Sequence, residues 1–200
     1  MIIAKFQVII GFLVFAVLLN FETKAQNTDH LKVPGPVNFH GEEFHLSWSS
    51  HPSSTYYKQE YVRKGEKVES FNEMVLLEFL AGNATPKGMV AQKVQELEKR
   101  KQTDPLVNFE VIESPDGKEF ILDFIMSSGP AENLEIAEWN AYRYKSVKDA
   151  SGKKGVILLG ISRRAYSNEI TSFLKELKSS RPGYRNELID FTMPAINTGK

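Results

Sequence analysis

The sequence of 200 residues contains no cysteine, and this absence removes several classes of chemistry at once. Without thiols there is no disulfide, no cysteine nucleophile, no redox relay and no thiolate metal site. The chain must therefore be stabilised by a hydrophobic core, for which its 42% of hydrophobic residues provide the material. In an exported protein this absence would also favour a bacterial envelope or growth medium, because exported eukaryotic domains often carry disulfides.

An excess of charge of either sign is absent as well. The chain has 25 Lys and Arg against 25 Asp and Glu, so its formal net charge at pH 7 is zero. Proteins that bind nucleic acids usually carry a clear basic excess that neutralises phosphates. The sequence also contains no phosphate loop and no dinucleotide fingerprint. It therefore predicts no nucleic-acid partner.

Long hydrophobic runs are rare, and the one that is present lies near the N-terminus. Val8 to Leu19 is uninterruptedly apolar, with Lys5 before it and the small-residue pattern Thr23-Lys24-Ala25 after it. This is the arrangement of a secretory signal peptide, and the run is shorter than the roughly 20 residues that span a bilayer. We expect residues 1–25 to be removed by cleavage after Ala25, leaving no transmembrane anchor. The predicted localisation is periplasmic or secreted.

The remaining chain divides into an irregular leader (26–40), a single domain (41–182) and a C-terminal tail (183–200). Alternating apolar residues at 44–48 and 56–62 predict a hairpin of two strands. Ser70 followed by Glu73 matches a capping box, which predicts a short helix that ends near Gly82. Thr85-Pro86 predicts the start of a second helix that runs to about Lys101.

A meander of four strands follows in the predicted order. Its strands lie near 107–111, 120–126, 134–147 and 156–161, with a turn at 114–117 and the last strand buried on both faces. A final helix then ends before Pro182. Because hairpin connections imply antiparallel pairing, the predicted class is α+β: an antiparallel sheet, built from the N-terminal hairpin and the meander, covered by helices.

This order of elements, from about Thr85 to Ser180, resembles the PsbP-like fold, including the periplasmic DcrB family of bacterial envelope proteins. The segments that carry the likeness are the charged helix VAQKVQELEKRKQTDP, the strands VNFEVIES, KEFILDFIM, EWNAYRYK and GVILLGISRRA, and the closing helix NEITSFLKELK. The resemblance implies a PsbP-like α/β/α sandwich. It also implies an accessory or adaptor role, since proteins of this kind are mostly non-enzymatic envelope or complex-assembly factors.

No set of residues forms a recognisable catalytic or metal-binding motif. The four histidines all lie between residues 30 and 51, and spacings of five and six residues match no strong ligand pattern; they are His30, His40, His45 and His51. The segment GISRR at 160–164 lacks the second glycine of a nucleophile elbow. We therefore predict no metal, no cofactor and no enzymatic activity.

Aromatic residues on two predicted strands are the candidate binding surface. Strand alternation places Trp139 on one face of its strand and Tyr142 and Tyr144 on the other. Tyrosine, tryptophan and arginine are favoured at binding hot spots, although aromatics in strands often pack under helices instead. The candidate residues are Trp139, Tyr142, Arg143, Tyr144, Tyr57 and Tyr61.

These observations predict an exported, non-enzymatic accessory module that binds a protein partner in the cell envelope. The alternative, from a different functional class, is a carrier of a small apolar ligand or lipid. It rests on the order of elements, which also suits folds in which a curved sheet grips a long helix around a cavity.

Overall fold

A computed structural model describes residues 27–199. The predicted signal peptide and its cleavage site after Ala25 lie outside these described residues. Within them, eight strands form one sheet in the order β1-β2-β3-β4-β8-β7-β6-β5, and every neighbouring pair is antiparallel. The strands are β1 (Val37–Phe39), β2 (Glu42–Ser53), β3 (Tyr56–Arg63), β4 (Glu73–Ala81), β5 (Asn108–Glu113), β6 (Glu119–Ser128), β7 (Ile136–Lys148) and β8 (Lys154–Tyr166).

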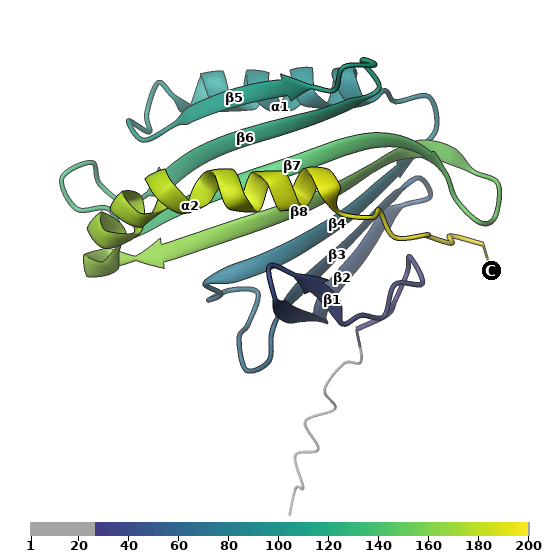
Figure 1. Cartoon of the computed structure of the whole chain (residues 1–200), viewed down its shortest axis with the longest axis horizontal. Coiled ribbons are helices and arrows are strands. Elements are labelled where there is room, and N and C mark those ends of the chain that lie inside the picture. The colour runs from purple at the N-terminus through teal and green to yellow at the C-terminus, as the bar shows by residue number, and fades with distance from the viewer. Residues whose placement is uncertain (1–26, 200) are drawn as a thin grey trace, which may run out of the picture.

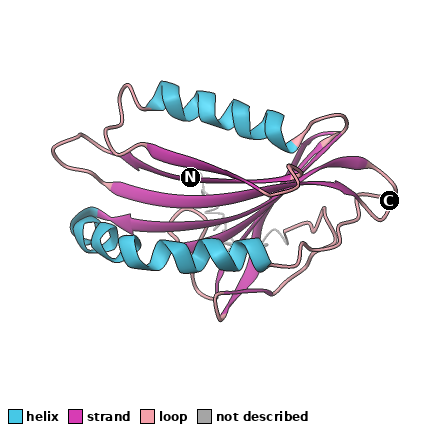
Figure 2. Cartoon of the chain, turned by 45° about the horizontal axis from the view of Figure 1, so that its top comes forward, coloured by secondary structure: helices cyan, strands magenta, loops and turns pink. Residues whose placement is uncertain are grey.

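Two α-helices lie on opposite faces of this sheet, as Figures 1 and 2 show. Helix α1 (Pro86–Arg100) packs over β5, β6 and β7, and α2 (Ile170–Asp190) packs over β7 and β8 from the other side. A short 3-10 turn, η1 (Ser167–Glu169), leads into α2. We call the two sides the α1 face and the α2 face. The α+β class predicted from the sequence is confirmed.

The sheet curls around α2. Tyr184 in the middle of this helix contacts Phe39 on the edge strand β1, with 6.4 Å between ring centroids. The same Tyr184 meets Trp139 on β7 edge to face, at 6.0 Å. Because β1 and β7 are far apart in the strand order, only a strongly curved sheet brings both to one side chain. The α2 face is therefore the inside of the curve and holds the larger core.

Several predicted elements are confirmed. The strands β2 and β3 form the N-terminal hairpin, and β5 to β8 form the meander with a turn at 114–117. Helix α1 begins as expected, since the hydroxyl of Thr85 accepts a hydrogen bond from the backbone N–H of Gly88 at 3.1 Å. Strand β8 is central and buried over Val156–Ile161. The predicted hairpin and the predicted meander belong to one sheet, because β4 pairs with both β3 and β8.

The helix predicted at 70–82 is wrong, because this segment is strand β4. Residues 74–77 are consecutive apolar side chains that are all buried. A helix would expose part of such a run, whereas a central strand between β3 and β8 buries both of its faces. The capping-box pattern at Ser70 and Glu73 is coincidental, since Glu73 points into the α2 face and binds Arg163. In the part of the chain from residue 27 onward, one helix, not two, precedes the meander.

The predicted end of the last helix before Pro182 is also wrong. Helix α2 continues through Pro182 to Asp190, and the residues after it pack against the domain, with Ile196 buried. A proline inside a helix loses one backbone hydrogen bond, but burial of Tyr184 and Leu188 beyond it offsets that cost. The leader is similarly part of the fold, because β1 lies within it and Leu31 is fully buried.

A candidate binding groove on the α1 face

Helix α1 covers only half of the α1 face. It packs on β5, β6 and β7, whereas the β2–β4 half of the same face has no helix over it. A groove of about 430 Å³ lies at the boundary, between α1 and strands β3, β4, β7 and β8. We call it the α1 groove. It is the candidate functional site.

The floor of the α1 groove is apolar. Leu76 and Leu80 on β4 and Leu158 on β8 point to the α1 face, and Met89 closes the groove from α1. Positions two apart on a strand share one face, so β4 directs Leu76, Glu78 and Leu80 into the groove together. The intervening residues Leu77 and Phe79 enter the core on the α2 face.

Three tyrosines form the walls of the groove: Tyr56 on β3 and Tyr142 and Tyr144 on β7. The Tyr142 ring lies over Gly160, where a Cβ atom would come within 2.7 Å of Cδ1. The same ring meets Phe124 edge to face at 5.0 Å. Burial, and then the negative charge of nearby glutamates, raises the pKa of all three phenols. The hydroxyls therefore stay protonated at neutral pH.

Charged side chains of both signs border the groove, and two pairs of them neutralise each other. Lys58 Nζ lies 2.8 Å from Oε1 of Glu60, and Lys93 Nζ lies 3.0 Å from Oε2 of Glu96. Glu78 is different. Its nearest cation is Lys58, at 3.9 Å, and this lysine is closer to Glu60. Burial raises the pKa of Glu78, although Tyr56, Lys58 and Lys93 act in the opposite direction.

One large apolar side chain stands exposed beside the groove. Trp48 on β2 pairs with Glu60 on β3, so its ring also lies on the α1 face, and it is 37% exposed. Its ring centroid is 5.8 Å from Nζ of Lys58. Trp48 therefore extends the groove into a wider surface along β2 and β3.

The six residues predicted as a binding surface do not form one surface. Tyr142 and Tyr144 line the α1 groove, but Trp139, Arg143, Tyr57 and Tyr61 lie on the α2 face. Trp139 is fully buried and donates its indole N–H to Oδ1 of Asp123 at 2.6 Å. The expectation of an exposed aromatic patch around Trp139 is therefore wrong, because α2 covers that face of β7.

The other three residues have structural roles. Tyr61 is fully buried and donates its hydroxyl to the carbonyl of Val33 at 2.7 Å, which fixes the leader. Tyr57 stacks on His51 with ring centroids 4.0 Å apart. Arg143 forms an ion pair with Glu119 at 2.6 Å and binds backbone carbonyls at the end of α2.

The sequence reasoning missed Glu78, Lys58 and Trp48. Glu78 was hidden by the wrong assignment of 70–82 as a helix. The sequence does contain a signal for Lys58. Tyr56, Lys58 and Glu60 are two residues apart on one predicted strand, so they share one of its faces. The partners of that face come from β4 and β8, which the local pattern does not reveal.

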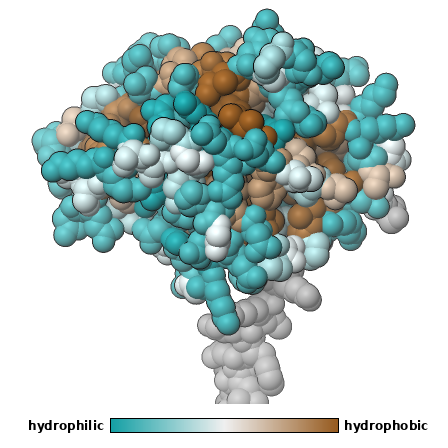
Figure 3. Space-filling model, viewed as in Figure 1, coloured by the Kyte–Doolittle hydropathy of each residue, from teal (hydrophilic) through white to brown (hydrophobic). Residues whose placement is uncertain are grey.

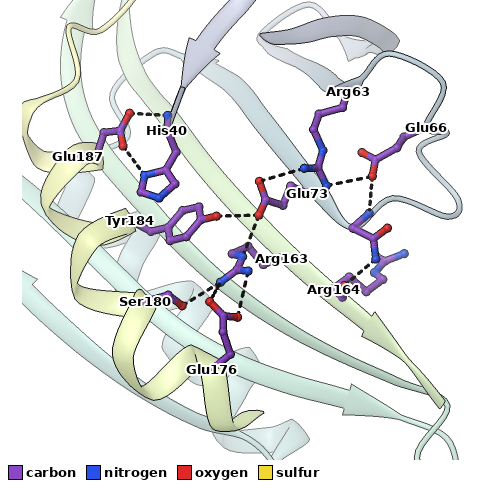
Figure 4. A network of polar contacts seen from close by, with 11 residues as sticks. His40, Arg63, Glu66, Glu73, Arg163, Arg164, Glu176, Ser180, Tyr184 and Glu187 are labelled. Carbon is purple, nitrogen blue, oxygen red and sulfur yellow. Dashed lines mark hydrogen bonds and ion pairs between the residues drawn. The ribbon is translucent and has the colours of Figure 1, made fainter. Parts of the chain in front are cut away.

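A polar network ties α2 to the sheet on the other face (Figure 4). Arg163 binds Glu73 and Glu176, and the hydroxyl of Tyr184 donates to Oε1 of Glu73 at 2.7 Å. At the edge of the network, Nδ1 of His40 lies 2.6 Å from Glu187. Because these groups satisfy one another, we interpret the network as structural. Within residues 27–199 no three potential ligands from His, Asp and Glu gather into a metal-binding group.

A protein-family model matches residues 31–193, so the chain belongs to the family that this model describes. No curated protein matches the chain, and neither does any solved structure. Among residues 27–199, no helix is both long enough and apolar enough to cross a membrane.

Proposed function

We propose that this family member is an exported, non-enzymatic accessory or adaptor module that binds a protein partner in the bacterial cell envelope. The observation that supports this proposal is the uncovered half of the α1 face, where exposed Trp48 adjoins the tyrosine-walled α1 groove. The proposal includes cleavage after Ala25, a periplasmic or secreted location and the relation to PsbP-like and DcrB-like proteins.

The composition of this surface suits recognition of a protein. Tryptophan and tyrosine are enriched among the residues that dominate binding energy, and such anchors sit in pockets with a polar rim. Here Trp48 and Tyr56 provide anchors, and the Lys58–Glu60 and Lys93–Glu96 pairs provide the rim.

The opposite side of the molecule, which carries α2, has a different surface. There, hydrophobic side chains reach the surface in patches separated by hydrophilic ones (Figure 3).

The protonation states in the groove also favour binding over catalysis. A phenol with a raised pKa is a poor nucleophile and a poor base at neutral pH, but its hydroxyl can both donate and accept a hydrogen bond. The tyrosines of the α1 groove are of this kind. The groove therefore presents hydroxyl groups for hydrogen bonding above an apolar floor.

Native mass spectrometry of the mature protein, purified gently from its own envelope fraction, tests this function. We expect a defined complex with a second protein. Trp48→Ala should remove that protein, because an anchor side chain is lost. Ile189→Ala is the matched control, since Ile189 is also exposed and apolar but lies on α2. Monomeric wild-type protein, or a complex that Trp48→Ala leaves intact, would contradict the proposal.

A second candidate function is the carriage of a small apolar ligand, which a cavity on the α2 face favours. This cavity has a volume of about 300 Å³ and lies between the sheet, the leader and the segment after α2. Its lining includes Val33, Tyr61, Val75, Leu159 and Phe191. The volume is at the lower end of the range for small-molecule sites. An added mass below about 1 kDa in the same spectra, lost on denaturation, would favour the carrier function.

A further inference from the structure

We propose that the α1 groove receives a lysine side chain of the protein partner, with its ammonium group beside Glu78 and its methylene groups on the leucine floor. This inference rests on the proposed function, because it supplies the chemistry of the partner at that same surface. It is carried by three observations: the charge left over in the groove, the acceptors around Glu78 and the access past Trp48.

The charge around the groove leaves one negative group without a dedicated partner. Two lysines and two glutamates line the groove, and Glu60 adds a third carboxylate beside Lys58. Each lysine makes its short contact with a glutamate other than Glu78. The side chain of Glu78 is only 14% exposed. A desolvated carboxylate is stabilised by a cation at contact distance, because the attraction is stronger where water is excluded. A cationic ligand therefore improves the environment of Glu78.

The acceptors in the groove match a primary ammonium group. An ammonium group donates three hydrogen bonds and accepts none. Glu78 supplies carboxylate oxygens, and Tyr56 and Tyr144 line the same groove with hydroxyl groups that can accept a hydrogen bond. These oxygens lie above the apolar floor of Leu76, Leu80 and Leu158, which suits the methylene stem of lysine.

The position of Trp48 argues for a protein as the source of the ammonium group. Trp48 lies next to Lys58 at the edge of the groove and is exposed. A partner that inserts a lysine at Glu78 also covers the indole of Trp48. The contact at Glu78 then supplies an ion pair, and the contact at Trp48 supplies buried apolar area. A free amine would leave Trp48 in water.

The test is a titration of the full mature protein with Nα-acetyl-lysine amide, followed by two-dimensional NMR. A fragment of about 13 non-hydrogen atoms at ordinary ligand efficiency binds with a Kd of roughly 1 mM. We expect shifts at Glu78, Tyr56 and Tyr144. Nα-acetyl-norleucine amide, which lacks the charge, should bind at least about tenfold more weakly.

Two variants complete the test. Glu78→Gln keeps the size of the side chain and should weaken lysine binding by about tenfold, because the charge is removed. Tyr144→Phe, which keeps the ring, should weaken it by a few fold. Glu98→Gln is the matched control on the outer side of α1 and should change nothing. Thermal melting of each variant shows whether it is folded.

Three results would overturn the inference: equal binding by Glu78→Gln, equal binding of norleucine amide, or tighter binding of Nα-acetyl-arginine amide or octanoate. The outcome is separable from that of the proposed function. A partner captured by wild-type protein and equally by Glu78→Gln refutes the lysine contact alone. Lysine amide that binds in the groove of a protein without any envelope partner refutes the proposed function alone.

Discussion

At the scale of single residues, the α1 groove depends on the close approach of Tyr142 to Gly160. A Cβ atom at position 160 would lie 2.7 Å from the tyrosine ring. Gly160→Ala is therefore expected to displace the ring and to lower the free energy of unfolding by about 1–3 kcal/mol. Urea unfolding measures this change. Gly183→Ala is the control, because its Cβ would contact nothing and alanine favours a helix by up to about 1 kcal/mol.

Equal urea midpoints for wild-type protein and Gly160→Ala would contradict the packing of Tyr142 on β8. The same glycine explains why Tyr142 is not an ordinary exposed strand residue. A side chain at position 160 would occupy the space that the ring now fills. The Tyr142 ring can therefore form the wall of the groove because the residue opposite it on β8 is a glycine, which has no Cβ atom.

At the scale of elements, Arg143 fixes the C-terminal end of α2 to the sheet. Its guanidinium donates to the backbone carbonyls of Leu188 at 3.0 Å and Phe191 at 2.8 Å, and its side chain is only 11% exposed. Arg143→Ala should lower the free energy of unfolding by about 2–4 kcal/mol, because Glu119 and two carbonyls lose their partner.

The control for this prediction is Lys145→Ala. Lys145 also binds Glu119, at 2.7 Å, but its side chain is 39% exposed. Exposed ion pairs contribute about 0–1 kcal/mol, so this variant should unfold almost as wild-type protein does in urea. Similar losses for both variants would show that Arg143 acts only through Glu119 and does not hold the helix end.

The central position of β4 in the sheet predicts slow hydrogen exchange of its backbone amides. Strand β4 pairs with β8 over Glu73–Ala81 and with β3 over Met74–Leu80, whereas β5 is an edge strand that pairs with β6. Amide hydrogens of β4 should therefore exchange only through global unfolding, and outward amides of β5 should exchange much faster. Native-state hydrogen exchange followed by NMR measures both. Rapid exchange throughout Glu73–Ala81 would contradict the central position.

At the scale of the whole molecule, Asp149 joins the C-terminal tail to the loop between β7 and β8. Oδ2 of Asp149 accepts hydrogen bonds from the N–H of Thr198 at 3.0 Å and from its hydroxyl at 2.5 Å. The backbone N–H of Asn197 donates to the carbonyl of Leu31 at 2.9 Å. The tail therefore connects the N-terminal leader to the loop between β7 and β8.

This junction predicts a pH dependence of stability. Burial disfavours the ionised carboxylate, but hydrogen bonds from Thr198 and Ser151 outweigh it and lower the pKa of Asp149 from 3.8 to about 2. The ionised form is favoured in the folded state, so its stabilisation is full above pH 3.8 and is lost as the pH falls to about 2. Asp149→Asn should lower the free energy of unfolding by about 1–2 kcal/mol at pH 7. It should also make that free energy depend less on pH in the acid range.

Urea unfolding at several pH values measures this effect, with Asp190→Asn as the control, because Asp190 is exposed at the end of α2. The idea of an acid-sensitive junction fails if Asp149→Asn and wild-type protein lose stability in parallel between pH 4 and pH 2.

Local signals in the sequence determined much of this fold. The hairpin β2–β3, the cap at Thr85, the turn at 114–117 and the meander were all predictable, because each depends on residues close together in the chain. Alternation also placed Tyr142 and Tyr144 on one face of β7 and Trp139 on the other. Alternation does not show which face of β7 a helix covers.

Only the tertiary structure decided the remaining features, and the reason is that they depend on distant partners. The buried run at 74–77 is compatible with a helix or a strand until β3 and β8 flank it. Helix α2 passes Pro182 because the curled sheet buries Tyr184 and Leu188. Glu78 became part of a site because tertiary packing brought β3, β4, β7 and α1 to one groove, which no local pattern in the sequence describes.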